Sequence, residues 1–424
     1  MPVNIISYLP TTNQDNYEDS QNLTALEKTY TAYFEHQGET VIFWRESSLR
    51  GLAGIAIGHQ HQTDQHFLYL FTSLHGIEAI KTLEKHQLID HTQSHIQIIW
   101  SGNQPMQGLE DLTAHTVYLP KFSSKETTKL HRDCTLVRLP GIPALPLEPR
   151  SPPADTTIQT TAPDDKLHSN SKMIWVLGGD ALKANAGAEL TMENWQLLPK
   201  QHPERVVNLL VENGILASLD HVTIINSDRT GLMQPKDGQS DAQQHLFQHA
   251  TGLQETTYHY HPSSAGYTDP VTEAAITCIE EHCAYEVCHF WQPPQGEKTA
   301  MQSTREGKID NFLLDPNTIL LMPGDSSTEV SKLISSAACI EKRAQIYVVI
   351  GESTPDRQRA WILDLYSQGY FSCIDVHTDS SLDDILYPVC LTDEPPTPKN
   401  IMGAIYQHLQ QQPAQSCQTS TLKL

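Results

Sequence analysis

The segment TILLMPGDSSTEVSK, residues 318–332, joins a buried-strand pattern to residue types that can bind a phosphate. Its apolar run, Ile319 to Met322, predicts a strand that Pro323-Gly324 ends. A helix is expected from Thr328 to Ala338, after three residue types that commonly start helices: Asp325, Ser326 and Ser327. A helix N-terminus presents backbone N–H groups and the positive end of the helix dipole, which suit an anionic phosphate. An ordinary strand-to-helix junction has the same pattern.

Two further segments with binding chemistry follow predicted strands. The strand Met173–Leu177 runs into Gly178-Gly179, where the absent side chains allow a ligand to approach the backbone. The strand His221–Ile225 runs into residues 226–231, where Arg229 could neutralise the charge of a leaving group.

Each of these residues has a structural alternative. The glycine pair can be a tight turn that requires positive φ. Arg229 can form a surface ion pair, for example with Asp228. Asp325 is more commonly a helix N-cap than a ligand contact.

The best candidate for a catalytic base is His75. It lies beside Gly76 at a predicted strand-to-helix turn, where an imidazole can transfer protons near neutral pH. A solvated loop histidine is the simpler interpretation. A second polar cluster, GHQHQTDQH, contains His59, His61 and Asp64.

Metal sites and a catalytic cysteine are disfavoured. The glutamines around His59, His61 and Asp64 are typical of a solvated loop. In EEHCAYEVCHF, residues 280–290, the candidate zinc ligands are adjacent pairs, whereas closed zinc sites separate ligands by two or more residues. No cysteine lies on a recognisable nucleophile turn. We therefore expect no metal.

The composition excludes several classes of protein. A formal net charge of -22 over 424 residues disfavours nucleic acid as a partner, because phosphate backbones require clustered Lys and Arg. No run of 18 apolar residues is present, and the N-terminal MPVNIISYLP has no signal-peptide pattern, so neither a membrane span nor secretion is expected. The scattered cysteines are typical of a reduced, cytoplasmic protein.

Strands alternate with helices in both halves of the chain, which predicts parallel βαβ units. The first half has strands expected at residues 4–9, 40–44, 67–72, 95–100, 116–119 and 134–139, with helices at 22–36, 49–57 and 77–86. In the second half, further helices are expected at 204–213, 243–252, 270–283 and 355–368, with a last strand at 345–350. In such sheets ligands bind at the carboxyl ends of the strands, which in the first half are followed by residues 10–21, 72–76 and 101–104.

A shift in composition divides the chain. Residues 140–172 are rich in Pro, Thr, Ser and Asp, which is a linker composition. We therefore predict two Rossmann-like domains, 1–139 and 173–392, that face each other across a cleft. Residues 393–424 are expected to hold a crossover helix, Ile401–Gln410, and a disordered tail.

Three segments in the same order resemble the bacterial and plant mitochondrial-fission-protein-like family of glycosyltransferases. The family's glycine pair is matched by WVLGGD, and its Ser-Arg-Arg-Thr is matched in part by TIINSDRTG, where Asp228 replaces the first Arg. Its Gly-Asp-Ser followed by Ser-Glu is matched by GDSSTEVSK, with Ser331 kept and Lys332 in place of Glu. The likeness covers roughly residues 170–370 and is looser in the first half.

The resemblance implies a GT-B fold, an α/β class of two Rossmann-like domains, and transfer of a sugar from a nucleoside diphosphate sugar to an acceptor. The second domain would bind the donor without a metal or another cofactor, and the first would hold the acceptor and the base, His75. The donor-binding residues would be Gly178, Gly179, Asn226, Arg229, Thr230, Gly324, Asp325, Ser326, Ser327 and Ser331. Two alternatives stay open: a non-catalytic relative that binds a nucleotide or a protein, and a sugar-nucleotide hydrolase or epimerase.

Overall fold

The computed structural model describes residues 3–8, 17–59, 66–89, 94–99, 116–123, 134–148, 171–182, 195–226, 230–231, 269–288, 309, 312–376, 382–391 and 394–411. At residues 17–22, 66, 72–78, 94–95 and 99 only the backbone is described. The chain divides into two compact units, Met1–Leu145 with Lys399–Leu424, and Pro146–Pro398.

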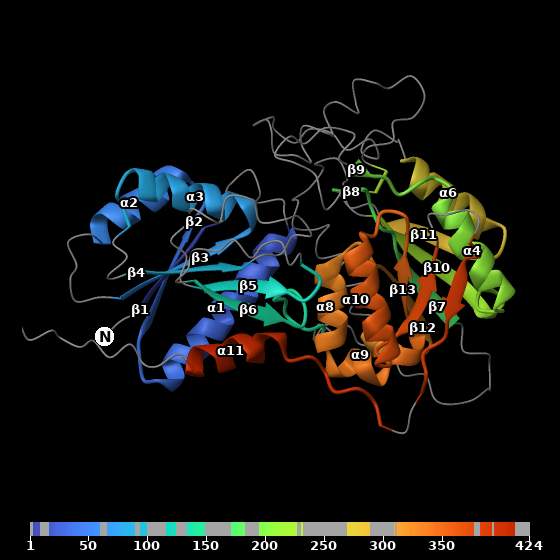
Figure 1. Cartoon of the computed structure of the whole chain (residues 1–424). Coiled ribbons are helices and arrows are strands. Elements are labelled where there is room, and N and C mark those ends of the chain that lie inside the picture. The colour runs from blue at the N-terminus through green and yellow to red at the C-terminus, as the bar shows by residue number, and fades with distance from the viewer. Residues whose placement is uncertain are drawn as a thin grey trace, which may run out of the picture. The chain divides into compact units, whose positions relative to one another are not determined.

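The first unit is a parallel sheet with helices on both faces (Figure 1). Its elements are β1 (Val3–Tyr8), α1 (Tyr17–His36), β2 (Val41–Glu46), α2 (Leu49–His59), β3 (His66–Thr72), α3 (Ser73–Lys85), β4 (Ser94–Ile99), β5 (Thr116–Pro120), β6 (Thr135–Leu139) and α11 (Ile401–Gln411). The strand order is β2-β1-β3-β4-β5-β6, and every pairing is parallel.

Alternate residues of the strands build a core on each face of this sheet. Ile5 packs with Leu26 of α1 and Ile405 of α11 on one face. Its neighbour Ile6 packs with α2 and with Ile80 of α3 on the other face. Strands buried on both faces require continuous apolar runs, which explains why the sequence pattern predicted them.

The C-terminal helix α11 belongs to the first unit although the second unit separates it from the rest of that unit in sequence. The Tyr33 hydroxyl donates to the Leu409 carbonyl at 3.1 Å, and the rings of Tyr33 and Tyr406 meet edge to face at 5.4 Å. The helix predicted at Ile401–Gln410 is therefore confirmed.

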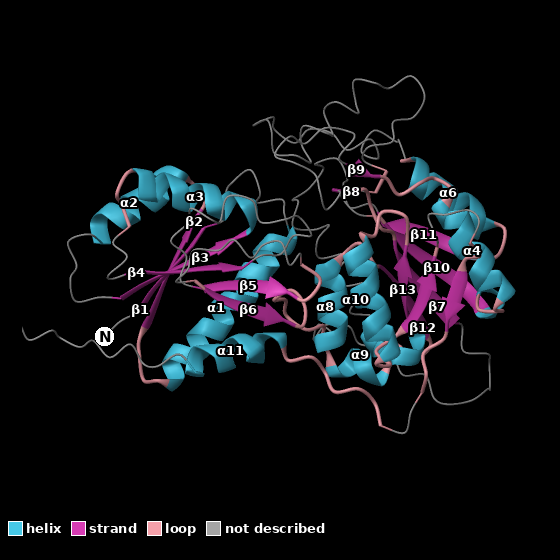
Figure 2. Cartoon of the chain, in the orientation of Figure 1, coloured by secondary structure: helices cyan, strands magenta, loops and turns pink. Residues whose placement is uncertain are grey.

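The second unit is also a sheet between two layers of helices (Figure 2). Its elements are β7 (Ser171–Val176), β8 (Ala181–Leu182), β9 (Trp195–Gln196), α4 (His202–Glu212), η4 (Leu216–Ser218), β10 (Leu219–Ile225), α6 (Pro270–Glu280), β11 (Ala284–Cys288), β12 (Thr318–Pro323), α8 (Ser327–Ser335), α9 (Ala337–Glu341), η6 (Arg343–Gln345), β13 (Ile346–Ile350), α10 (Asp356–Ser367), β14 (Ser372–Asp375) and β15 (Ile385–Tyr387). The α4 and α6 helices cover one face, and α8 and α10 cover the other (Figure 1).

The strand order of this sheet is β11-β10-β7-β12-β13-β14-β15, with only β15 antiparallel. Counted within the unit, it is 3-2-1-4-5-6 with one added edge strand, the order of dinucleotide-binding Rossmann sheets. The order reverses between β7 and β12, which pair directly, as in the register of Leu320 with Ile174. This reversal is the point at which ligands bind in open α/β sheets.

The α/β class and the parallel sheets confirm the sequence prediction, but several boundaries differ. Helix α1 begins at Tyr17 rather than residue 22, and α3 begins at Ser73, directly after β3. The helix predicted from Thr328 to Ala338 is interrupted at Ser336, which caps the separate helix α9. The strands β8, β9, β11, β14 and β15 have no counterpart among the predicted strands.

Other predictions fall on residues outside the described part of the chain. They are the helix at 243–252, the ligand-binding loops at 10–16 and 101–104, most of the linker (149–170) and the tail from 412. At the start of the predicted linker Ile142 and Ala144 are buried. Across the described helices, none combines the length and apolarity that crossing a membrane requires.

Candidate functional site

Two turns meet where the strand order of the second sheet reverses. The turn after β7 contains Gly178 and Gly179, and the turn after β12 contains Gly324 and Asp325. The Gly179 amide donates to Asp325 Oδ2 at 3.1 Å, which joins the two turns. Three of the segments singled out in the sequence thus include residues that the fold brings together at one site: these two turns, and the turn after β10.

Gly178 is required by close packing rather than by positive φ. Neither glycine of the pair has a positive φ. A Cβ added at Gly178 would lie 2.6 Å from Asp325 Oδ1 and 3.3 Å from Pro323 Cβ. The structural alternative of a turn that requires positive φ is therefore wrong for this pair. At Gly178 the Asp325 carboxylate occupies the space that a side chain would need.

Asp325 is not the N-cap of α8. Ser326 occupies the N-cap position, and its side chain makes no capping hydrogen bond. Asp325 is 8% exposed, and its Oδ2 accepts the hydrogen bond from the Gly179 amide in the opposite turn. The first turn of α8 therefore keeps its dipole without a side-chain cap, which is the feature that favours an anion at a helix N-terminus.

Helix α8 is buried from Ser327 to Ile334. Within it the Ser331 hydroxyl donates to the Ser327 carbonyl at 2.7 Å. Lys332 and Glu329 form a buried ion pair at 2.9 Å. The Lys332 ammonium group is thus engaged within the helix itself.

A third turn, after β10, reaches the same place. The Thr230 hydroxyl donates to the Gly178 carbonyl at 2.7 Å. Asn226 lies at the end of β10, where its amide contacts Asp269 and Thr272 at 3.5 Å each. Both side chains hold protein groups in place, and the candidate Arg229 between them is outside the described residues.

Asp269 anchors this turn. Its carboxylate accepts from the amides of Val271 and Thr272 and caps helix α6. Gly231 has φ +61°, and a Cβ there would lie 2.7 Å from Asp269 Oδ1. Burial raises the pKa of the Asp269 carboxyl, although these hydrogen bonds oppose the shift.

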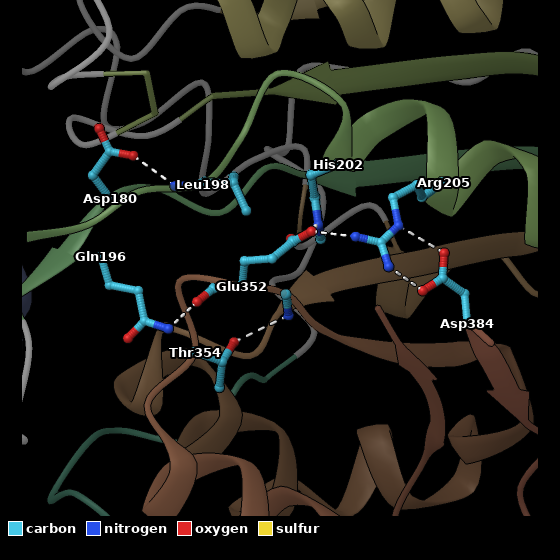
Figure 3. A network of polar contacts seen from close by, with 9 residues as sticks. Asp180, Gln196, Leu198, His202, Arg205, Glu352, Thr354 and Asp384 are labelled. Atoms are coloured by element: carbon cyan, nitrogen blue, oxygen red, sulfur yellow. Dashed lines mark hydrogen bonds and ion pairs between the residues drawn. The ribbon is translucent and has the colours of Figure 1, made fainter. Parts of the chain in front are cut away.

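A polar network that the sequence analysis missed lies beside the switch point (Figure 3). His202, the first residue of α4, is 5% exposed, and its Nδ1 lies 3.0 Å from Glu352 Oε2, just after β13. Glu352 also pairs with Arg205 Nη1. Arg205 in turn holds Asp384 through Nε at 2.8 Å and through Nη2. Hydrogen bonding to Asp384 and the charge of Glu352 raise the pKa of Arg205 against the opposing effect of burial.

The same region holds the loop that precedes α4. Asp180 Oδ1 accepts from the Leu198 amide at 2.8 Å, and the Gln196 side chain donates to the Glu352 carbonyl (Figure 3). The predicted helix began at Glu204, which left His202 in a loop. The only sequence signal was the His-Pro pair at a helix start, which predicts a helix boundary but no partner.

These residues enclose a small pocket at the carboxyl end of the sheet. Its walls include Gly178, His202, Asp325, Gly351 and Ser353. A Cβ at Gly351 would lie 2.6 Å from His202 Cε1, so glycine lets the turn after β13 pack against the imidazole.

In the first unit, the predicted base His75 lies in the first turn of α3, not in a loop. The strand order reverses between β1 and β3, and α3 follows β3 directly. His75 is therefore at the switch point of its own sheet. Of the alternative cluster, His61 and Asp64 lie outside the described residues.

His59 is a core histidine. It is 9% exposed, and its ring stacks on Phe67 with centroids 4.0 Å apart. Burial lowers the pKa of its imidazole, which favours the neutral form.

The Cys and His residues near 282–289 do not form a metal site in the described part of the chain. His282 is exposed, and Cys283 and Cys288 form no disulfide in the described part of the chain. Burial, with the charge of Asp220, raises the pKa of the Cys283 thiol, which disfavours a reactive thiolate. No group of three metal-binding side chains is found among the described residues.

A comparison with protein-family models and one with curated proteins gave no match to this chain.

Proposed function

We propose that the second unit binds the diphosphate of a nucleoside diphosphate sugar and that the protein is a GT-B-like glycosyltransferase. One observation carries the proposal: at the reversal of strand order, the Gly178–Gly179 turn is joined to the turn before α8 through Asp325. A Rossmann strand order has its ligand crevice at this point.

The phosphates would lie at the N-terminus of α8, beside Ser326 and Ser327. Helix α8 has nine residues, and its N-cap side chain makes no capping bond, so its first turn can serve an anion. Asp325 places a negative charge nearby, so a cation has to compensate it when a diphosphate binds. Arg229, which directly precedes Thr230 in the sequence, is the residue proposed for this role; the Thr230 hydroxyl donates to the Gly178 carbonyl.

Turnover would require an acceptor and a base in the first unit, with His75 as the proposed base. The arrangement of the two units across a cleft is part of this proposal. The proposed reaction would use no metal, because the helix dipole and Arg229 would stabilise the leaving diphosphate.

The alternative is a GT-B-fold protein that binds a nucleotide, or a protein partner, without turnover. One observation favours it: Lys332, which stands where the resembled family has Glu, is buried and paired with Glu329. A lysine that is paired within its own helix cannot take the place of a carboxylate that contacts a ligand.

Isothermal titration with UDP, GDP and ADP tests the binding proposal. Arg229→Ala should weaken the binding of whichever nucleotide binds wild type by about 1–3 kcal/mol, because one charge-assisted hydrogen bond is lost. The matched control is Arg357→Ala, which removes an exposed arginine of α10 and should leave the affinity unchanged. Equal affinity in wild type and Arg229→Ala would contradict the placement. Product detection with the corresponding sugar nucleotides then separates the transferase from the non-catalytic alternative.

A further inference from the structure

We propose that the pocket beside the switch point, between His202 and Ser353, binds a hydroxyl group of a ribose or a sugar. This inference rests on the proposed function, because the hydroxyl would belong to the ligand whose phosphates lie at α8. It assigns a binding role to His202 and Ser353, which are not among the residues that the resemblance implies.

The first support is Ser353. Its side chain lines the pocket and is 1% exposed. Its Oγ finds no hydrogen-bond partner among the residues that the structure describes. A buried hydroxyl without a partner destabilises the folded protein, so one that is kept at a pocket wall is expected to bind a ligand.

The second support is the orientation of His202. Its Nδ1 is 3.0 Å from Glu352 Oε2, and an ionised carboxylate only accepts hydrogen bonds. The neutral imidazole therefore carries its proton on Nδ1, which makes Nε2 an acceptor. Glu352 is itself fixed by Arg205, so the ring is held in one orientation.

The charges around the pocket select the class of ligand. Asp325 lines it, Glu352 contacts His202, and Asp384 is paired with Arg205, so among the described residues three carboxylates and one guanidinium lie in or next to the pocket. A phosphate here would meet an excess of negative charge. A hydroxyl group suits the pocket, because it can donate to the imidazole or the Asp325 carboxylate and accept from the Ser353 hydroxyl.

The size of the pocket agrees with this class. Gly178 and Gly351 form two of its walls, and at each of them an added Cβ would lie 2.6 Å from a neighbouring side chain. The space left between them has room for about one water-sized group, so it admits one hydroxyl group rather than a base or a whole sugar ring.

Isothermal titration of wild type and Ser353→Ala with pyrophosphate, UDP, 2′,3′-dideoxy-UDP and UDP-glucose tests the proposal. Pyrophosphate has no hydroxyl-bearing ring, so its affinity should be equal in both proteins. UDP or UDP-glucose should bind Ser353→Ala about 3- to 10-fold more weakly, the loss expected for one net hydrogen bond. If the ribose supplies the hydroxyl, the difference in affinity between UDP and its dideoxy analogue shrinks in the variant. If the sugar supplies it, the difference in affinity between UDP-glucose and UDP shrinks instead.

The melting temperature of the ligand-free protein provides the control. Ser353→Ala removes a hydroxyl without a partner, so its Tm should equal or exceed that of wild type. Ser336→Ala is the matched variant: this buried serine caps α9 and donates to the Leu147 carbonyl, so its loss should lower Tm and leave ligand affinity unchanged.

Each failure has its own signature. If UDP and UDP-glucose bind wild type and Ser353→Ala equally, the hydroxyl pocket is wrong while the phosphate site stands. A clear fall in the Tm of Ser353→Ala also overturns the pocket, since the hydroxyl would then have a partner in the folded protein. If pyrophosphate, UDP, GDP and ADP all fail to bind wild type, the proposed function fails and this inference fails with it. If GDP or ADP binds in place of UDP, its dideoxy and glucose derivatives replace the uridine probes.

Discussion

The Asp325 carboxylate accepts a hydrogen bond from the Gly179 amide at 3.1 Å, across 146 residues of sequence. The same carboxylate occupies the space that a side chain at Gly178 would need. The two turns at the switch point are therefore a single structural unit, and the position of the α8 N-terminus relative to the glycine turn depends on it.

Removing this carboxylate should destabilise the second unit. In Asp325→Ala a buried N–H loses its acceptor, which costs about 1–3 kcal/mol. Asp325→Asn keeps an acceptor oxygen and should cost less. Urea denaturation measures both. Asp383→Ala, which removes an exposed aspartate, is the control and should stay within about 0.5 kcal/mol of wild type. A stability of Asp325→Ala equal to that of the control would mean that the contact does not hold the turns.

Gly178→Ala should act through the same contact. Its Cβ would lie 2.6 Å from Asp325 Oδ1, so the carboxylate has to move away from Gly179. We expect a loss of about 1–3 kcal/mol in urea denaturation. Gly54→Ala is the matched control: it lies in helix α2, nothing lies within 4 Å of its added Cβ, and the change should stabilise by about 0.5–1 kcal/mol. Opposite signs for two Gly→Ala changes would identify the close approach as the cause.

The two variants should also be non-additive. Once Gly178→Ala has displaced the carboxylate, removing that carboxylate should cost little more, because both changes break the same contact. A double variant whose loss equals the sum of the single losses would show that the two residues act independently.

Much of the fold could be predicted from local patterns. The runs Met173–Leu177 and Thr318–Met322 are buried on both faces, so their apolar sequence alone indicates strands, and the two strands pair directly. By contrast, β14 consists of only four residues and includes Ser372 and Asp375, so it lacks such a pattern. The strand is buried because it pairs with β13, and its sequence alone does not indicate this burial.

The site could be predicted only in part, because its decisive contacts join distant residues. The Gly178–Gly179 and Gly324–Ser327 segments were recognisable as turns after strands. The contact between His202 and Glu352 spans 150 residues, and no spacing rule connects a helix start to a strand end at that separation. The strand order that brings them together becomes apparent only in the folded sheet.

The stability of the first unit should depend on pH through His59. Burial lowers the pKa of its imidazole, so below about pH 6.5 the unfolded chain binds a proton that the native state resists. Stability should therefore fall as pH drops from the ordinary histidine pKa toward the lowered native pKa. His59→Leu should reduce this fall. Urea denaturation at pH 7.5 and pH 5.5 measures it, with His86→Leu, which removes an exposed histidine, as the control. A pH dependence unchanged in His59→Leu would show that another group causes the acid sensitivity.

The proposed base gives the prediction that depends most directly on turnover. His75 lies in the first turn of α3, which follows β3 at the reversal of strand order in the first sheet, where a ligand crevice is expected. If the protein transfers a sugar, His75→Ala should lower kcat by about 10²–10⁴-fold and leave donor affinity nearly unchanged, since the donor is proposed to bind the second unit. The control is His86→Ala, an exposed histidine just beyond the end of the same helix. Turnover of His75→Ala within about threefold of wild type would remove His75 as the base. The next candidates would be His61 and Asp64, because the burial of His59 and the stacking of its ring on Phe67 place that residue in the core.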